Sequence, residues 1–377
     1  MKLALIGAGY TAKDLAAQAK KMGIETHCFA WEKGAVAKEI VDCFYPISVT
    51  EKEQILNECL KIGIDGVVSA ASPAIPTAAY IARKMGLNGN PTEVAEQIGN
   101  KKRTRDLTDG IETLTRIPYQ LVTDVSTLER MKLPVVLKPV LGGGKAGLSV
   151  IRESGDVKKA YDYAVSSGYT SFMAEEYIEG GKEYSVESLS FHGVNYILQI
   201  TDKESGGPPH CVELAHHQPA ALSDVMWKRV ETAVDSVLKA LGILNGPCHT
   251  EIKIVNDKIY LIEVNGRLAG GHIAHPLVEL STGYPYLEGV IKVALNQDPM
   301  INVSALRKEY ASVFFVTRQT EHLKPIFDEC EKHKWCYQKF SATEELVDYE
   351  KNDGYRTNYF IYHSLDCPPP FRAIKNG

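Results

Sequence analysis

Residues 246–275 read GPCHTEIKIVNDKIYLIEVNGRLAGGHIAH, and their pattern predicts a β-hairpin. Two apolar-rich runs, 248–255 and 258–264, flank Asn256 and Asp257, a residue pair typical of tight turns. We start from this hairpin because it carries the side chains best suited to bind a cation, and we interpret the other motifs of the chain in relation to it.

Glu263 and Asn265 carry two of the oxygen-bearing side chains in this hairpin. Side chains alternate between the two faces of a strand, so these two residues share one face, and the same alternation places Ile259 and Leu261 beneath them. Glu251, on the preceding strand, is the third candidate. Carboxylate and amide oxygens are ligands that a hard divalent cation prefers.

The position of Glu251 depends on the length of the turn. A two-residue turn at 256–257 places Glu251 opposite Ile262, on the face that lacks the other carboxylate. A three-residue connection through Lys258, or a bulged loop at this turn, places it opposite Glu263 instead. The first register gives a solvated hairpin with scattered charges, and the second gives a cation site. We expect the second register.

The chain has 377 residues, too many for one ordinary core, and we expect two or three domains. Apolar residues make up 44% and charged residues 24%, as in globular proteins, and no apolar run approaches the ~20 residues that span a bilayer. The net charge of −5 and the lack of a basic block argue against nucleic acid as the main partner.

The eight cysteines show neither a C-x-x-C pair nor regular spacing, which indicates free thiols in a reducing compartment. The start, MKLALIGAGY, reads as a first strand rather than a signal peptide. We therefore expect a cytoplasmic protein that does not act at a membrane, and whether it forms a homodimer is left open.

Strand and helix signals alternate through residues 1–97, which predicts a parallel sheet covered by helices on both faces. Gly7-Ala8-Gly9 at the first strand-to-helix turn, together with Glu32, partly matches a dinucleotide-binding fingerprint. A tight turn without a ligand explains these glycines at least as well.

Lysines in the next segment occur in two settings. Lys101 opens the run KKRTR, whose charge is typical of a solvated helix face. Lys138 stands inside an apolar strand that ends at Pro139, and glycines follow within 142–147. A buried lysine is costly without an anion, and consecutive glycines let backbone amides converge on phosphate. Either a phosphate site or a hairpin with a mobile tip explains this stretch.

The run SFMAEEYIEGGKEYSVESLSF, residues 171–191, reads as strand, turn and strand. Adenine is commonly held at such a connector, and Glu183 offers a carboxylate to a ribose. The polar run 201–210 predicts a mobile loop over a site, and His216 and His217 read as exposed loop histidines. Beyond residue 300, two strands indicate a small terminal subdomain in which the sequence reveals no chemistry.

Taken together and in this order, these pieces resemble the ATP-grasp ligases. The resemblance rests on Asn100-Lys101, Val135-Val136-Leu137-Lys138-Pro139 with its glycine loop, Glu175-Glu176-Tyr177-Ile178, Glu183, His249-Thr250-Glu251 and Ile262-Glu263-Val264-Asn265-Gly266-Arg267. Within that superfamily, ALGILNGPCHTEIK and the run from Glu263 to His272 look most like carboxylate-amine ligases that include L-amino acid (dipeptide) ligases.

The fold that the resemblance implies is α/β. An N-terminal parallel-sheet domain would span 1–97, a two-lobed α+β ATP-grasp domain would span 98–178 and 179–298 with the metal hairpin in its second lobe, and a small C-terminal subdomain would span 299–377.

The resemblance also implies a set of site residues. ATP would be bound by Lys101, Lys138, Gly143, Gly144, Lys145, Glu176, Tyr177, Ile178 and Glu183. Two Mg²⁺ ions, for which Mn²⁺ can substitute, would be coordinated by Glu251, Glu263 and Asn265. Arg267 would be catalytic, facing the transferred phosphoryl group and the substrate carboxylate. Candidates for substrate contacts are His216, Gly270 and His272.

The implied reaction activates a small carboxylate, expected to be an amino acid, as an acyl phosphate and couples it to an amine, with ADP and phosphate as the other products. Purine-pathway, carboxylase and pyrrolysine-type ligases are alternatives within the superfamily. An NAD-dependent oxidoreductase, based on the turn at Gly7 and Gly9, is an alternative outside it that leaves the hairpin unexplained. A nucleotide-binding regulator without activity is a third, and it leaves the intact metal residues without a use.

Overall fold

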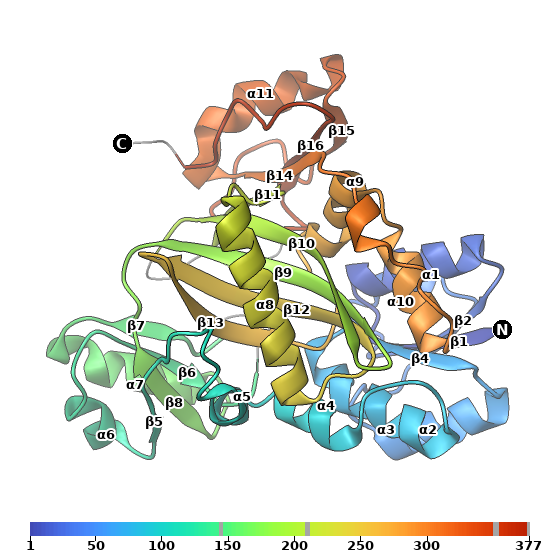
Figure 1. Cartoon of the computed structure of the whole chain (residues 1–377), viewed down its shortest axis with the longest axis horizontal. Coiled ribbons are helices and arrows are strands. Elements are labelled where there is room, and N and C mark those ends of the chain that lie inside the picture. Colours follow the sequence, from blue (N-terminus) through green and yellow to red (C-terminus); the bar gives the residue numbers. More distant parts are fainter. Residues whose placement is uncertain (143–145, 208–211, 350–353, 375–377) are drawn as a thin grey trace.

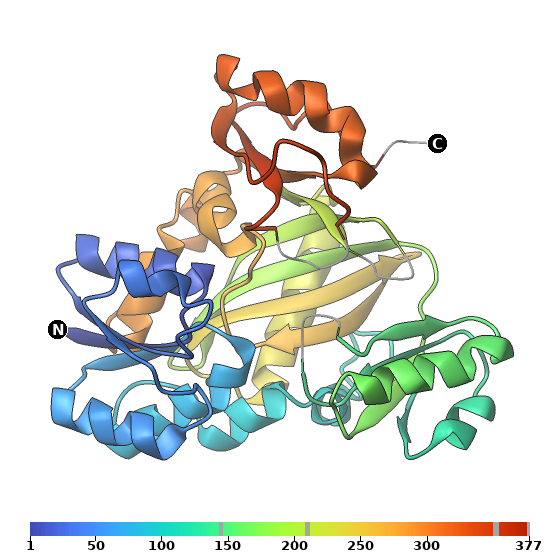
Figure 2. The same cartoon turned by 180° about the vertical axis from the view of Figure 1, so that it is seen from behind.

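The computed structural model describes residues 1–142, 146–207, 212–349 and 354–374, which form three sheets flanked by helices (Figure 1, Figure 2). The α/β class expected from the sequence is confirmed, since a parallel sheet comes first and antiparallel sheets follow. In these ranges no helix is long and apolar enough to cross a membrane, and the seven cysteines they contain are free.

The first sheet is parallel and has the strand order β3-β2-β1-β4. Its strands are β1 (Lys2–Ile6), β2 (Glu25–Phe29), β3 (Cys43–Tyr45) and β4 (Gly66–Ser69). The helices that connect them are α1 (Tyr10–Lys21), α2 (Lys52–Ile62) and α3 (Ile75–Met85). A helix from much later in the chain, α10 (Tyr286–Ala294), also packs on this core beside α1 (Figure 1).

The second sheet is antiparallel, with the order β5-β8-β6-β7. Two helices, α4 (Thr92–Ile98) and α5 (Lys101–Thr108), lead into it. Its strands and covering helices are β5 (Tyr119–Val122), α6 (Val125–Glu129), β6 (Val135–Pro139), β7 (Ser149–Ile151), α7 (Val157–Ser166) and β8 (Phe172–Glu176). The predicted strand around Lys138 is therefore β6, and it ends at Pro139 as expected.

The third sheet has the order β13-β12-β9-β10-β11-β14-β16-β15. Its strands are β9 (Lys182–Phe191), β10 (Val194–Ser205), β11 (Glu213–Gln218), β12 (Gly246–Val255), β13 (Lys258–Asn265), β14 (Tyr310–Val316), β15 (Cys336–Phe340) and β16 (Asn358–Ser364). The hairpin thus lies at one edge, and the strands beyond residue 300 continue the same sheet toward the other. Two short helices, α9 (Val278–Thr282) and α11 (Lys324–Glu329), accompany these late strands.

Helix α8 (Asp224–Leu241) covers one face of the third sheet (Figure 1). Its buried residues recur at helical spacing and pack against apolar residues of β9, β12 and β13. The helix begins at Ser223, whose side chain accepts a hydrogen bond from the Met226 amide, and ends at Gly242, which has positive φ. The opposite face of β12 carries polar side chains, among them His249, Glu251 and Lys253.

We expect the two glycines between β8 and β9 to respond differently to alanine. Both have positive φ, 66° at Gly180 and 63° at Gly181, which strains any residue with a Cβ. At Gly181 an added Cβ would also lie 2.1 Å from the Ile254 carbonyl oxygen, whereas at Gly180 it would meet nothing within 4 Å. Gly180→Ala should cost about 1 kcal/mol of stability and Gly181→Ala roughly 3 kcal/mol. Urea unfolding of both variants measures this difference, and equal losses would contradict the described packing.

Candidate functional site

The turn between β12 and β13 has two residues. Val255 pairs with Lys258, and Asn256 and Asp257 have φ values of 47° and 61°. Positive φ at both central positions is the geometry of a type I′ turn, which Asn and Asp tolerate. The predicted three-residue or bulged turn is therefore wrong.

A β-bulge further along the hairpin nevertheless produces the predicted pairing. Ile252 is opposite Leu261, but Glu251 is opposite Glu263, so Ile262 is an extra residue on β13. The bulge thus gives the register between β12 and β13 that a longer turn was expected to give. The two carboxylates face each other across the hairpin.

The same bulge changes which side chains share a face of β13. Ile259 and Leu261 pack in the core under α8, and so does Val264. Glu263 and Asn265 lie on the opposite face and line a cavity. The expectation that Ile259 and Leu261 lie beneath Glu263 is wrong, because one inserted residue reverses the alternation beyond it.

A cavity of about 320 Å³ lies between the second and third sheets and gathers most of the predicted site residues. Those that line it are Lys101, Lys138, Glu176, Tyr177, Ile178, Glu183, His216, Glu251, Glu263, Asn265, Arg267 and Gly270. The predicted ATP residues Gly143, Gly144 and Lys145 lie outside the described residues. His272 does not line this cavity.

Lys138 is buried, and its anionic partner is Glu175. The Lys138 ammonium contacts one oxygen of the Glu175 carboxylate, and the Arg105 guanidinium binds both oxygens at 2.8 and 3.2 Å. Burial would raise the pKa of Glu175, but the charges of Lys138 and Arg105 outweigh it and lower that pKa. The anion that a buried lysine requires is thus supplied by the protein itself.

Arg105 also joins this cluster to the hairpin. Its Nη2 atom donates a hydrogen bond of 3.0 Å to the carbonyl of Ile262, the bulged residue of β13. Arg105 is only 7% exposed, so the interpretation of the basic run as a solvated helix face is wrong at this position. The neighbouring Lys102 does match it, since it is half-buried and pairs with Asp106 on the same helix.

Glu251 lies among buried cations. Lys203 Nζ is 3.1 Å and His249 Nε2 is 3.2 Å from its carboxylate, and Lys203 also lies 2.6 Å from Glu213. Burial would lower the pKa of His249, but the charge and hydrogen bond of Glu187, together with Glu251, raise it to about 9. Burial would raise the pKa of Glu251, and the Lys203 and His249 cations lower it instead. Glu251 is therefore held as a carboxylate.

The segment 201–210 is not wholly a loop. Strand β10 continues to Ser205, and Lys203 is 7% exposed on it, so the expected mobile loop is wrong for residues 201–205. Residues 208–210 lie outside the described ranges. A strand extending this far brings Lys203 against Glu251.

His216 and His217 lie on β11 and are buried, so their interpretation as exposed loop histidines is wrong. His216 Nδ1 donates to the Gly271 carbonyl at 2.8 Å, and its Nε2 lies 2.9 Å from Glu213. His217 Nε2 lies 2.6 Å from Glu204, away from the cavity lining. Of these two histidines, His216 lines the cavity and His217 does not.

His272 lies among aromatic rings. Its ring centroid is 4.4 Å from that of Tyr355, 4.2 Å from that of Tyr359 and 6.3 Å from that of Phe315. Burial lowers the pKa of His272 to about 3. The structure therefore places a neutral imidazole in the packing between the third sheet and the segment around 355, rather than in the cavity wall.

The connector after β8 forms one end of the cavity. The amides of Glu176 and Tyr177 donate to the carbonyls of Pro118 and Pro134, at 2.9 and 3.1 Å, so these two amides are used within the protein. Lys253 Nζ donates to the Ile178 carbonyl at 2.7 Å and lies 5.3 Å from the centre of the Tyr177 ring.

Lys101 reaches the hairpin from α5, and Arg267 follows directly after β13 and contacts the first sheet. Lys101, in the first turn of α5, has its Nζ 3.2 Å from a Glu263 oxygen. Arg267 donates from Nε to the Ser72 hydroxyl at 2.8 Å and from Nη1 to the Leu268 carbonyl at 2.8 Å. Ser72 follows β4, so the first sheet helps to orient this arginine through the carboxyl end of one of its strands.

The oxygen donors on the hairpin suit Mg²⁺. Glu251 and Glu263 are paired directly, Asn265 lines the same cavity, and all three offer the hard oxygen atoms that this ion prefers. Lys203 and Lys101 counter the two carboxylate charges where the oxygens would otherwise repel each other.

Several cavity residues were given no role by sequence reasoning, although Glu175 and His249 stand in the motifs quoted above. They are Glu175, Glu213, His249, Lys253, Phe315, Tyr349 and Gly354. Alternation along β12 offers a signal for two of them, since His249 and Lys253 are spaced by two from Glu251. The last three come from beyond residue 300, where no local pattern marks a site.

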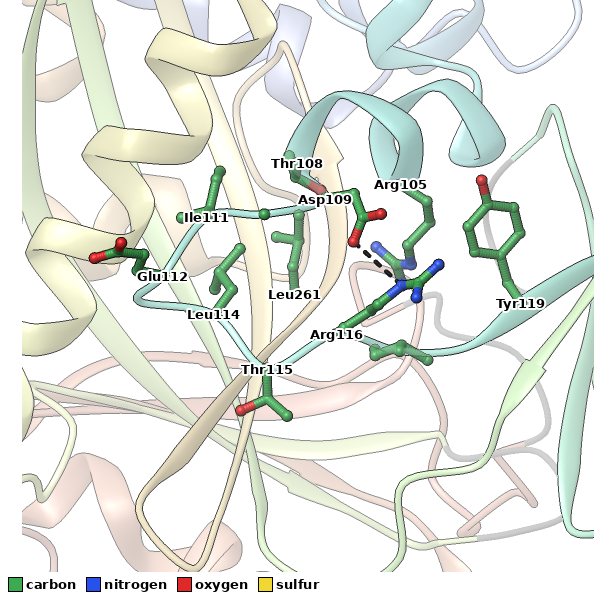
Figure 3. Close-up of a pocket in the computed structure, with 12 residues that line it drawn as sticks. Arg105, Thr108, Asp109, Ile111, Glu112, Leu114, Thr115, Arg116, Tyr119 and Leu261 are labelled. Atoms are coloured by element: carbon green, nitrogen blue, oxygen red, sulfur yellow. Dashed lines mark ion pairs between the residues drawn. The ribbon is translucent and has the colours of Figure 1, made fainter.

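A second hollow of about 320 Å³ is lined by the segment from Arg105 to Tyr119 and by Leu261 (Figure 3). Its visible ion pair joins Arg116 Nε to Asp109 Oδ1 at 3.2 Å, and both side chains are mostly exposed. Exposed pairs contribute little. None of the described residues with a predicted role lines this hollow, so we assign it no function.

Comparison with known proteins gives consistent matches. Residues 131–275 match the family model of the ATP-grasp domain. Sequence relatives include the uncharacterized protein y4rH of Sinorhizobium fredii, 28% identical over 67% of this chain, and formate-dependent phosphoribosylglycinamide formyltransferase of Aliivibrio fischeri, 25% identical over 71%. The matches cover 54% and 69% of those proteins, so this chain spans about half the length of y4rH. The crystal structure of L-amino acid ligase from Bacillus licheniformis has a TM-score of 0.80 at 21% identity and shares 97% of this chain and 93% of that one.

We expect Glu175→Gln to destabilise the protein by roughly 3–5 kcal/mol, because it leaves Lys138 and Arg105 buried without their shared anion. Since the pKa of Glu175 is lowered on folding, its contribution is present above the unfolded value of about 4.3 and is lost as the pH falls through the folded value. Urea unfolding at about pH 7 and about pH 3 should therefore show a difference between wild type and variant that shrinks in acid.

Glu176→Gln is the matched control for this substitution, since Glu176 is the next residue and is exposed. It should change the free energy of unfolding by less than about 0.5 kcal/mol at either pH. A Glu175→Gln variant as stable as this control would show that the buried ion cluster does not stabilise the fold.

Proposed function

The chain belongs to the ATP-grasp superfamily, and we propose that it is an ATP- and Mg²⁺-dependent ligase that joins an amino acid, through its carboxylate, to an amine. The observation that carries the proposal is the pairing of Glu251 with Glu263 in a cavity that also contains Arg267, Lys101 and Lys138. Carboxylates paired in this way beside three cations suit the transfer of a phosphoryl group.

The ATP-binding roles follow from where each side chain lies. Tyr177 and Ile178 form the connector wall, where an adenine would lie, and Glu183 lies nearby on β9, where a ribose would present its hydroxyls. Lys138 and Lys101 lie between this wall and the hairpin and would contact the phosphates.

Glu251, Glu263 and Asn265 would hold two Mg²⁺ ions, which when bound supply positive charge to the β- and γ-phosphates. The neighbours of Glu251 hold it in the carboxylate form, since Lys203 and His249 lower its pKa. Lys101, 3.2 Å from Glu263, would exchange part of that contact for a phosphate when ATP enters.

Attack of a substrate carboxylate on the γ-phosphate brings two anions together, and Arg267 is placed to counter their charge. Its planar guanidinium can bind a carboxylate or phosphate oxygen pair, and Ser72 fixes its orientation from the first sheet. The carboxylate oxygen bonds to phosphorus as the bond to ADP breaks, which leaves an acyl phosphate and ADP. An amine then attacks the acyl carbon, phosphate leaves, and the amine proton passes to solvent or to phosphate.

An amino acid suits the charges at this end of the cavity. Arg267 offers a cation for its carboxylate, and Glu213, which also lines the cavity, offers an anion for its ammonium group. His216 and Phe315 lie beside Glu213 and give that region a partly apolar wall.

Two alternatives have observations that weigh on them. The likeness to a formate-dependent formyltransferase favours a smaller carboxylate, with the same acyl phosphate chemistry. The NAD-dependent oxidoreductase rested on the turn at Gly7, where an added Cβ would lie 3.1 Å from the Ala71 side chain. Close packing between the segments that follow β1 and β4 thus accounts for the glycine at position 7, and no bound dinucleotide is needed to explain it.

We expect ATP hydrolysis to ADP and phosphate to rise at least tenfold when an amino acid and an amine, or two amino acids, are supplied together with Mg²⁺. Mass spectrometry should detect a condensed product, and hydroxylamine should trap the acyl phosphate as a hydroxamate. Stimulation by formate or bicarbonate, with no response to any amino acid, would replace this substrate assignment with the smaller carboxylate.

Glu263→Gln should lower turnover by about a hundredfold or more, because a neutral amide gives up the charge that a bound cation needs. Thermal unfolding should change little, since Glu263 lies on the cavity face rather than in the core. Asp257→Asn removes a carboxylate from the turn of the same hairpin and is the control, with turnover expected to stay within about twofold. Equal turnover in both variants would remove Glu263 from the metal site.

A further inference from the structure

Three metal-ligating side chains converge outside the cavity, at the edge of the first sheet. Glu25 and His27 are two residues apart on β2 and so share a face, and Cys43 on the edge strand β3 is paired directly with His27. One ligand atom from each of the three lies within 4.8 Å of the other two. Carboxylate, imidazole and thiol are thus gathered at one point.

His27 has an unsatisfied nitrogen that faces this point. Its side chain is 4% exposed, and its Nδ1 lies 3.1 Å from the Tyr45 hydroxyl. Its Nε2 lies 2.9 Å from a Glu25 oxygen, yet it makes no hydrogen bond of acceptable geometry among the described residues. A buried polar atom without a hydrogen bond is costly, and this one lies beside the Glu25 carboxylate.

We propose that Glu25, His27 and Cys43 bind a divalent cation of the zinc class. A thiolate, an imidazole and a carboxylate form a mixed donor set that suits zinc better than Mg²⁺, with water completing four-coordination. At bond lengths of about 2.0–2.3 Å, tetrahedral donors lie roughly 3.3–3.8 Å apart, so the described atoms need to close by only about 1 Å. On binding, the Cys43 thiol releases its proton to solvent.

Neighbouring groups support this assignment. The Tyr45 hydroxyl can accept from Nδ1–H of His27, which leaves the Nε2 lone pair for the cation. Asp42, the other nearby carboxylate, has its Oδ2 atom committed to the amide and hydroxyl of Thr26, at 2.7 and 2.8 Å. Glu25 is half-exposed and provides access for an incoming ion.

The location indicates a structural or regulatory cation rather than a catalytic one. Glu25 and Cys43 begin their strands, whereas Ser72, which contacts Arg267, follows the end of β4. In a parallel sheet all strands begin on one side and end on the other, so this cluster and Ser72 lie on opposite sides of the sheet. A cation here would join the three-residue edge strand β3 to β2, and its loss would leave the catalytic cavity intact.

Cobalt titration of the full chain in saturating Mg²⁺ tests the proposal, since Co²⁺ occupies zinc sites and absorbs in the near ultraviolet when a thiolate is bound. We expect this absorption to reach its maximum at one equivalent in the wild type and to disappear on addition of zinc. Cys43→Ser should abolish it, and Cys367→Ser, which removes an exposed thiol elsewhere, should leave it unchanged. No absorption in the wild type, or the same absorption in Cys43→Ser, would overturn the proposal.

Two further measurements separate ligation from folding and from catalysis. Glu25→Gln alters a half-exposed side chain and should fold, but its affinity for zinc, measured by chelator competition, should fall at least tenfold. Zinc should raise the unfolding temperature of the wild type and not that of Cys43→Ser. ATP turnover with Mg²⁺ should be equal in the wild type and Cys43→Ser, so this proposal and the ligase proposal can fail independently. Unchanged zinc affinity in Glu25→Gln would exclude it as a ligand.

Discussion

The hydrogen bonds and ion pairs of Arg105 hold the site together. Its guanidinium binds Glu175 on the second sheet and the carbonyl of Ile262 on the third, and Glu175 in turn contacts Lys138. Both sheets that form the cavity are therefore tied to one buried cation. The position of the β13 bulge, and with it the face on which Glu263 lies, is stabilised by the same group that neutralises the carboxylate next to the proposed ATP phosphates.

Local pattern predicted the hairpin and the alternation of strands and helices in the first sheet, because each depends on near neighbours in the sequence. The same reasoning placed Glu251 opposite Glu263 for an incorrect reason. A type I′ turn and a bulge at Ile262 give the register that a longer turn would also have given. Residue types reveal a tight turn, but a bulge depends on the partner strand and on Arg105, which lies 157 positions from Ile262.

The residues that sequence reasoning missed share a dependence on distant contacts. Lys203 looked like part of a polar loop because its run is rich in Gly, Pro and charge, yet it is buried by pairing with Glu213 and Glu251. Phe315 reaches the cavity because β14 pairs with β11, a contact between segments about a hundred residues apart. Composition does not encode such pairings, so the basic run at Arg105 and the histidines of β11 were interpreted as exposed.

The third sheet is continuous from the hairpin to the last strands of the chain, and this continuity limits how the protein can be divided. A chain cut before β14 would leave β11 with a row of unpaired amides and carbonyls, on a strand whose residues are nearly all buried in the intact fold. Such an edge pairs readily with another copy of itself. A fragment that ends before β14 would therefore tend to aggregate, and in the intact chain the terminal strands protect β11 from pairing with another copy.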